Sequence, residues 1–209
     1  MKRLRLSLFG FTLIVSLLSL SSPFDFQRVS AQGSSPDTVP VYTTPDGFLL
    51  GDVVVGAEAH LVRNANGLTT NVHTYVSPAG AYTLWWVVFN HPQNCTTYLC
   101  TFDEPDFVIS ATGHPISDSA GTANFSGRLS VGGPYNNYIL YEGPDPGLTN
   151  PAGALITLVI RYHGPNLEPG GSNEFRSYFA GCPDGGAPCQ DKQLVVFPGD
   201  CSGLCLVPF

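Results

Sequence analysis

Positively charged side chains are scarce in this sequence. The 209 residues include 9 Lys and Arg against 16 Asp and Glu. Four basic residues and one acidic residue lie before residue 32, so the net charge from there onward is (9 − 4) − (16 − 1) = −10 with histidines neutral. A surface that binds nucleic acid or an anionic membrane needs a basic patch. We therefore expect neither of these partners.

Several enzyme motifs are also missing. The sequence contains no G-x-S-x-G nucleophile motif and no H-E-x-x-H zinc-protease motif. The one methionine is Met1, so the chain offers no axial thioether for a blue-copper site once its N-terminus is removed. A catalytic site needs no standard motif, but these absences favour a non-enzymatic protein.

Long apolar runs are absent beyond the N-terminus, which has the pattern of an export signal. A basic start at Lys2, Arg3 and Arg5 is followed by the apolar run Leu6 to Leu20 and by the small-residue site Val29-Ser30-Ala31. We therefore predict a signal peptide over 1–31 and a mature chain that begins near Gln32, without a transmembrane segment. The expected location is the periplasm, the cell surface or the extracellular space.

The cysteines occur as three close pairs. They are Cys95 and Cys100, Cys182 and Cys189, and Cys201 and Cys205. An exported chain meets an oxidising environment, so these cysteines are expected to form disulfides. Their spacings differ from the C-x2-C of zinc knuckles. Six cysteines allow fifteen pairings, of which pairing between sequence neighbours is the simplest, and each such bridge pins a loop.

The remaining composition is typical of β-structure. Residues 32–48 are polar and contain proline, which predicts a flexible lead-in, and 49–209 is expected to form one domain. Runs rich in Val, Thr and aromatic residues, separated by Gly, Pro and Asn, predict strands at 51–55, 57–65, 68–76, 81–90, 107–112, 122–131, 137–141, 154–163, 174–179 and 193–197. The predicted fold is all-β, a single antiparallel β-sandwich or barrel-like sandwich with long disulfide-pinned loops.

The segment AYTLWWVVFN, residues 81–90, is apolar on both faces of the predicted strand. Such a strand is expected at the centre of the sheet, with its second face covered by other residues. The long loop 132–153 is the candidate cover, since it carries Tyr135, Tyr138 and Tyr141. Alternatively, Trp86 and these tyrosines form an exposed platform on which sugar rings stack, as in a carbohydrate-binding module.

Two of the five histidines flank the hairpin signal Asn66-Gly67. If these two residues form the loop of a type I′ turn, His60 lies directly opposite His73 on the more polar face. Two imidazoles at that spacing can hold Zn²⁺ or Cu²⁺ if a third ligand joins them. His114 and His163 are the candidates for that ligand. The alternative is a cross-strand pair of polar side chains without metal.

Some stretches resemble known proteins. AHLVRNANG, AYTLWWVVFNHPQNC and NPAGALITLVIRYHGP resemble a group of exported bacterial β-rich proteins to which no activity is assigned. The resemblance covers about 51–197 and implies an exported, disulfide-bearing β-fold. GTANFSGRL is similar to the G-x-A-x-F-x-x-x-L pattern of chordin-repeat (CHRD) domains, whose β-sandwich is likened to that of copper/zinc superoxide dismutases. The dismutase H-x-H ligand pattern is missing here, so the resemblance does not imply that activity.

The sequence thus favours an exported non-enzymatic β-protein with a binding or structural role outside the cytoplasm. The first alternative is a copper or zinc protein that uses His60 and His73. The second is a carbohydrate-binding module that uses Trp86. The ligand, the oligomeric state and the disulfide connectivity stay open at this point.

Overall fold

The computed structural model describes residues 37–45, 49–95, 100, 107–116, 121–132, 147–165 and 189–199, with 107–116 described by their backbone alone. The strands are β1 (Asp37–Thr43), β2 (Val53–Asn64), β3 (Gly67–Tyr75), β4 (Gly80–Phe89), β5 (Phe107–Ile116), β6 (Thr122–Ser130), β7 (Leu155–Tyr162) and β8 (Gln190–Phe197). A 3₁₀ turn, η1 (Pro92–Asn94), follows β4. The described residues contain no helix that is long and apolar enough to cross a membrane.

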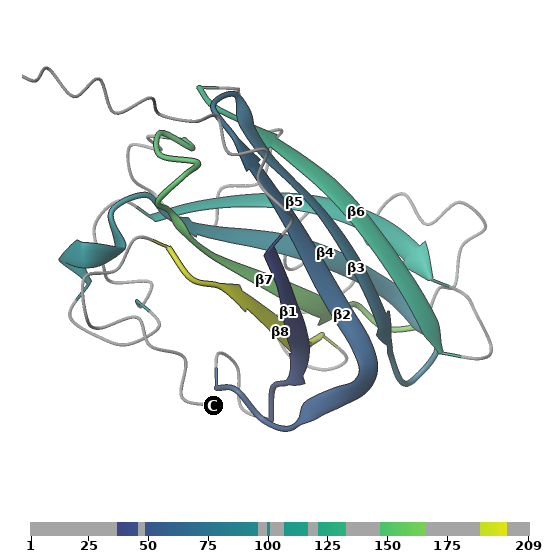
Figure 1. Ribbon diagram of the computed structural model, residues 1–209. Helices are drawn as coiled ribbons and strands as arrows, with labels where there is room; N and C mark the ends of the chain where they lie inside the picture. The colour runs from purple at the N-terminus through teal and green to yellow at the C-terminus, as the bar shows by residue number, and fades with distance from the viewer. Residues whose placement is uncertain are drawn as a thin grey trace, which may run out of the picture. The chain divides into compact units, whose positions relative to one another are not determined.

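The eight strands form one sheet in the order β5-β4-β7-β8-β1-β2-β3-β6. Every neighbouring pair is antiparallel. The sheet curves until its two end strands, β5 and β6, come into contact, which makes it nearly closed and barrel-like (Figure 1). The predicted all-β antiparallel fold is therefore confirmed.

The N-terminal part of the sheet corrects the predicted boundaries. Residues 37–43 were expected within a flexible lead-in, but they form β1, which lies between β8 and β2. Pro40 made this segment look like a loop because proline cannot donate to a strand ladder. The structure accommodates Pro40 at a bulge, where the register with β2 shifts between Pro40 and Tyr42. The two strands expected at 51–55 and 57–65 are one strand, β2, with Gly56 at a positive φ of 79°.

The strands expected over 68–76, 81–90, 122–131 and 154–163 are found to within one residue at each end. β5 extends four residues beyond the predicted 107–112, and β8 begins three residues before the predicted 193. The strands expected at 137–141 and 174–179 lie outside the described residues. Runs rich in Val, Thr and aromatic residues therefore located the described strands well, and the predicted bounds were least accurate where polar residues extend a strand.

The interior of the sheet is an apolar cluster drawn from seven strands. Its largest fully buried members include Tyr82, Leu84 and Trp86 of β4, with Phe125 of β6 and Phe197 of β8. These side chains alternate along their strands with residues on the other face, as the period of two requires. Burying each large apolar side chain contributes about 1.5–3 kcal/mol, so this cluster is the main source of stability.

A second apolar cluster lies on the opposite face of β4, β7 and β8. It contains Trp85, Val87 and Phe89 of β4 and is covered by Leu50 and by the disulfide between Cys95 and Cys100. Every residue of β4 and β7 is buried, which confirms that the strand AYTLWWVVF is central. Of the expected cover loop the structure describes 132 and 147–153, where Leu148 packs in the interior cluster, and the rest of the loop lies outside the described residues.

The β2–β3 hairpin turns one residue earlier than predicted. The closing pair is Asn64 and Gly67, so Ala65 and Asn66 form the loop. The side chain of Asn64 explains this register, because its Oδ1 accepts a hydrogen bond from the amide of Asn66 at 2.8 Å. Such an Asx turn starts at the asparagine that accepts the bond. As a result His60 pairs with Asn71, and His73 pairs with Glu58.

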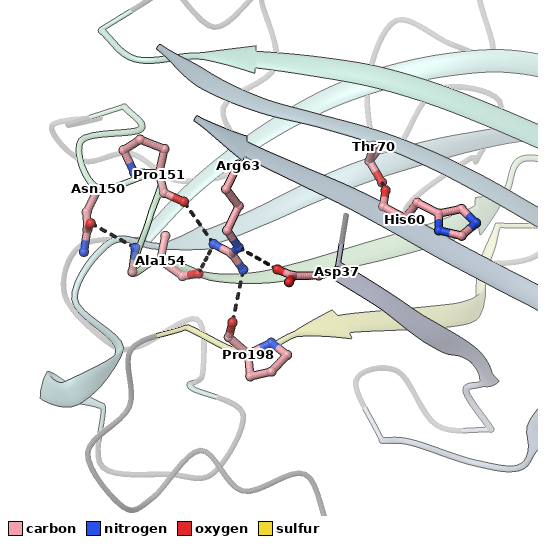
Figure 2. Close-up of polar contacts among 9 residues, drawn as sticks. Asp37, His60, Arg63, Thr70, Asn150, Pro151, Ala154 and Pro198 are labelled. Carbon is pink, nitrogen blue, oxygen red and sulfur yellow. Dashed lines mark hydrogen bonds and ion pairs between the residues drawn. The ribbon is translucent and has the colours of Figure 1, made fainter. Parts of the chain in front are cut away.

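Arg63 of β2 ties together the ends of three other segments at one end of the sheet (Figure 2). Its Nη1 donates to the carbonyl oxygens of Pro151 and Ala154 at 3.0 and 2.8 Å, and its Nη2 donates to that of Pro198 at 3.1 Å. Its Nε donates to Asp37 of β1 at 3.1 Å. The guanidinium therefore satisfies carbonyls that no strand ladder reaches and links β1 and β2 to the entrance of β7 and the exit of β8.

Replacing Gly67 with valine is expected to destabilise the protein strongly. Gly67 has a φ of +151°, and a Cβ there would collide with the carbonyl oxygen of Leu129 and lie 3.0 Å from Cα of Ser130. We expect a loss of about 3 kcal/mol or more in the free energy of unfolding, measured with urea. The control is Gly132→Val, because Gly132 also has a positive φ of 61° but nothing lies within 4 Å. Gly132→Val should lose only the free energy of the strained backbone conformation, about 1–2 kcal/mol. Equal losses in the two variants would show that the collision with Leu129 does not destabilise Gly67→Val.

Replacing Arg63 with methionine should cost about 3 kcal/mol of stability, because three carbonyl oxygens lose a charged donor in a site where the Arg63 side chain is 11% exposed. Urea denaturation measures this loss. Asp37→Asn is the matched control. The Asp37 side chain is 49% exposed, so its ion pair should contribute less than about 1 kcal/mol. If both variants lose the same stability, the ion pair and not the carbonyl bonds holds this end of the sheet.

Stability should fall as the pH rises above about 10, because of Tyr82. Burial, and then the charge of nearby Tyr162, raise the pKa of Tyr82 above its ordinary value near 10. The folded state then holds a proton that the unfolded chain releases, so the contribution is complete below that pH and is lost above it. Thermal unfolding between pH 8 and 11 measures the slope. Tyr82→Phe should flatten the slope, whereas Tyr75→Phe, at an exposed position, should leave it unchanged.

Candidate functional site

The outer side of β1, β2, β3 and β6 carries a row of exposed and half-exposed polar side chains, which we call the polar face. Strand alternation places them there, because the residues between them, such as Ala59, Leu61, Val72 and Phe125, point into the interior cluster. Cross-strand pairing brings them into neighbouring rows. The members of the polar face are Thr38, Glu58, His60, Asn71, His73, Tyr75 and Asn124.

His60 lies between two polar side chains on this face, Thr38 on one side and Glu58 on the other. Its Nδ1 lies 2.9 Å from Oγ1 of Thr38, and its Nε2 lies 3.3 Å from Oε1 of Glu58. A carboxylate only accepts hydrogen bonds, so the neutral tautomer that satisfies both contacts carries its proton on Nε2 and accepts from Thr38. The backbone carbonyl of His60 is held from the interior side by the hydroxyl of Thr70 (Figure 2).

His73 forms a separate pair one row away. Nδ1 of His73 lies 2.8 Å from Oδ1 of Asn124. An amide oxygen only accepts hydrogen bonds, so the imidazole is the donor, and the NH₂ group of Asn124 takes no part in this bond. The ring of Tyr75 meets the His73 ring edge-on at a centroid distance of 5.5 Å. These contacts hold the His73 side chain in one orientation on the face.

The predicted opposition of His60 and His73 is therefore wrong. The two residues share a face, but they are diagonal neighbours, because the Asx turn at Asn64 shifts the register. Each imidazole instead uses Nδ1 to contact a side chain of the adjacent strand, Thr38 for His60 and Asn124 for His73. The pair does not present two free nitrogens to one point.

The candidate third ligands do not complete a metal site in the described structure. His163 is buried at the far end of β7 and contacts Thr83 and Cys189. His114 lies on β5 opposite Tyr82, and its side chain is not described. The residues that the structure describes contain no group of three His, Cys, Asp or Glu side chains suited to hold a metal ion. A site for copper or zinc stays a prediction that none of these contacts supports.

Trp86 does not form an exposed stacking platform, which corrects the second alternative. Its side chain has no exposed surface and belongs to the interior cluster. Burial follows from its position on the inward row of β4, between Leu84 and Val88. The indole N–H has no hydrogen-bond partner within the described part of the chain. Tyr135, Tyr138 and Tyr141 lie outside the described residues.

A buried polar cluster occupies the other side of the molecule's central strands. Thr83 and Trp85 come from β4, His163 follows β7, and Cys189 precedes β8. Oγ1 of Thr83 lies 2.6 Å from Nε2 of His163 and accepts from the indole of Trp85. Next to this cluster Arg161 forms a buried ion pair with Asp191 at 2.7 Å. Sequence reasoning missed this cluster, because its members are brought together only by the order of strands in the sheet.

The predicted disulfide between Cys95 and Cys100 is confirmed. Cys189 is also disulfide-bonded, to a cysteine beyond the described residues. Cys182, Cys201 and Cys205 lie outside those residues, so the remaining connectivity stays as predicted from the sequence, with local pairing the simplest arrangement.

Comparison with known proteins leaves the function to be argued from the residues themselves. No protein-family model matches this sequence, and no match is found among curated proteins or solved structures. The resemblance to exported β-rich proteins and to chordin-repeat domains therefore stays an expectation from the sequence. In the part of the chain that the structure describes, function can be argued from two arrangements of side chains, the polar face and the buried polar cluster.

Proposed function

We propose that this chain is an exported, non-enzymatic β-protein that binds a ligand through its polar face. The observation that carries the proposal is the contrast between the two halves of the sheet. Both faces of β4 and β7 are buried, whereas β2, β3 and β6 keep one face open and lined with hydrogen-bonding groups. Folding requires only that the side chains of this face be polar. These side chains are also held in defined pairs, which folding does not require.

These pairs reduce the entropy that a ligand must remove. Thr38, His60 and Glu58 form one chain, and His73 with Asn124 forms another. Immobilising a flexible side chain on binding costs about 0.5–1.5 kcal/mol, and much of that cost is already met in the folded protein. The remaining donors and acceptors, such as Nε2 of His73 and the amide group of Asn124, point from a rigid sheet.

The chemistry of the face favours an uncharged, polyhydroxylated ligand, such as a glycan chain. Amides, imidazoles and a carboxylate supply donors and acceptors side by side, which suits neighbouring hydroxyl groups. Tyr75 adds an apolar surface, because its side chain is 45% exposed. A Cβ at Gly56 would lie 3.4 Å from Cε2 of Tyr75, so the ring lies close over the glycine backbone and is supported there.

A hydroxyl, an imidazole and a carboxylate also occur in series in hydrolases. In those enzymes the groups act in a site from which water is largely excluded. Here the His60 and Glu58 side chains are 36% and 58% exposed, and Thr38 is exposed on an extended strand. Solvent weakens their electrostatic coupling, so we assign the chain Thr38–His60–Glu58 to binding.

Export supports the same role. The N-terminal pattern of residues 1–31 predicts translocation, and a disulfide in the folded part fits an oxidising compartment. A negatively charged surface limits association with anionic polymers. The expected ligands are therefore neutral glycans that the protein meets in the periplasm, at the cell surface or outside the cell.

The test is affinity electrophoresis and calorimetry of the mature protein with soluble neutral polysaccharides, namely a β-glucan, a xylan and a mannan. We expect at least one to bind, and Tyr75→Ala and Asn124→Ala to weaken it about tenfold each, since one lost hydrogen bond or stacking contact is about 1.4 kcal/mol. Gln190→Ala is the matched control for the amide truncation, because Gln190 is exposed on β8. Binding to none of the polysaccharides, or equal affinity in all variants, would contradict the proposal.

A further inference from the structure

The tip of the β2–β3 hairpin places an exposed asparagine, Asn66, directly before a glycine that the fold requires. Gly67 has a φ of +151°, and a Cβ at this position would collide with the carbonyl oxygen of Leu129. The backbone of Asn66 is held on both sides. Its amide donates to Oδ1 of Asn64 at 2.8 Å, and its carbonyl oxygen accepts from the amide of Val131 at 3.0 Å. The fold therefore uses the backbone of Asn66 and keeps a glycine after it.

The side chain of Asn66 is not held. Its amide group takes part in no hydrogen bond in the part of the chain that the structure describes. Two other asparagines of the sheet differ, because Oδ1 of Asn64 accepts from the turn and Oδ1 of Asn124 accepts from an imidazole of the neighbouring strand. Asn71 is exposed and also lacks such a bond within the described residues, but the residue after it is the buried, β-branched Val72. Asn66 thus combines a free side chain with a following glycine.

We propose that Asn66 is a site of spontaneous covalent modification, at which a succinimide forms with Gly67 and opens to isoaspartate, which loosens the hairpin tip. Ring closure requires the backbone nitrogen of the next residue to reach Cγ of the asparagine. Glycine has no side chain to obstruct this approach and the greatest backbone freedom, whereas a β-branched residue such as Val72 is stiff and bulky. Gly67 belongs to the closing pair of the hairpin, so the attack follows local opening of the tip. This site does not depend on ligand binding by the polar face.

The reaction needs water alone as co-reactant. The backbone nitrogen of Gly67 loses its proton to solvent and forms a bond to Cγ of Asn66. The bond between Cγ and the side-chain nitrogen breaks, and that NH₂ group takes up a proton from solvent and leaves as ammonia. Water then adds to one of the two carbonyl carbons of the ring, and the bond from that carbon to the nitrogen of Gly67 breaks. Opening at Cγ restores the main chain and gives aspartate, whereas opening at the main-chain carbon gives isoaspartate.

The two products differ in what they do to the hairpin. In isoaspartate the main chain runs through the former side chain, so the loop gains a methylene between its closing residues Asn64 and Gly67. The carbonyl group that accepts from Val131 becomes part of a carboxylate outside the main chain. Aspartate keeps the backbone and changes only an exposed side chain. Isoaspartate is therefore the product that weakens the contact between the hairpin tip and the end of β6.

The experiment incubates the folded mature protein in mildly alkaline buffer, digests samples at acidic pH and follows the peptides by chromatography and mass spectrometry. Fragment spectra locate each modified position, and synthetic peptides identify aspartate and isoaspartate by their elution. We expect Asn66 to convert about tenfold faster than Asn71, because glycine and not valine follows it, and isoaspartate to be among the products. Conversion of Asn66 no faster than that of Asn71, or aspartate without isoaspartate, would overturn the proposal.

Two variants separate the effect on the fold from other changes during incubation. Asn66→Asp carries the added charge on an unchanged backbone, so the isoaspartate-rich fraction of the incubated parent should unfold at a lower urea concentration than this variant. Equal midpoints would overturn the proposed loosening of the hairpin tip.

Asn66→Gln is the matched control for incubation itself. Glutamine keeps an exposed amide, but its longer side chain closes a larger ring and reacts more slowly. We expect Asn66→Gln to keep its urea midpoint over the same incubation while the midpoint of the parent falls. If the variant loses as much stability as the parent, the change arises elsewhere in the chain and the proposal fails.

Discussion

The double burial of β4 and β7 is the constraint on which the rest of the structure depends. A strand that is apolar on both faces must be covered on both sides. The curvature of the sheet supplies the first cover, by bringing β1, β2, β3 and β6 across the interior. Leu50 and the Cys95–Cys100 disulfide contribute to the second cover. Because the other strands use their inner faces for this purpose, their outer faces stay open to water, and the polar face follows as the remaining surface.

Closing the sheet brings together the ends of several strands, where some backbone groups form no hydrogen bond within a strand ladder. Arg63 solves this at one end of the sheet, where its four hydrogen bonds reach segments far apart in the sequence. Gln193 acts similarly within the interior, where its amide donates to the carbonyl of Tyr75 and accepts from Thr74. Such side chains connect strands that are not neighbours in the sheet, and they fix its curvature in a way that pairwise ladders cannot.

The sequence was a good guide wherever a local pattern decided the structure. The apolar residues on both faces of AYTLWWVVF located a central strand, and the Cys95–Cys100 spacing predicted a loop-pinning disulfide. It failed where two local signals competed. Asn66-Gly67 suggested a turn with these two residues as its loop. The side chain of Asn64 instead accepts a hydrogen bond from the amide of Asn66, and the loop consists of Ala65 and Asn66. Because of Pro40, the segment that forms β1 was not predicted as a strand. Thr38 lies in β1, so its hydrogen bond to His60 could not be predicted from the sequence either. The contact between His163 and Cys189 depends on strand order, which local patterns do not encode.

The adjacent residues Trp85 and Trp86 have a consequence for spectroscopy. Because neighbouring residues of a strand face opposite sides, the two indoles lie in the two separate apolar clusters. Trp85 donates to Thr83 and packs in the cluster that contains a disulfide, a group that quenches indole emission. Trp86 packs in the interior cluster, and its indole N–H has no hydrogen-bond partner in the described structure. Each apolar cluster therefore holds one of the two indoles of the chain, and a single tryptophan substitution makes the other indole a reporter of one layer alone.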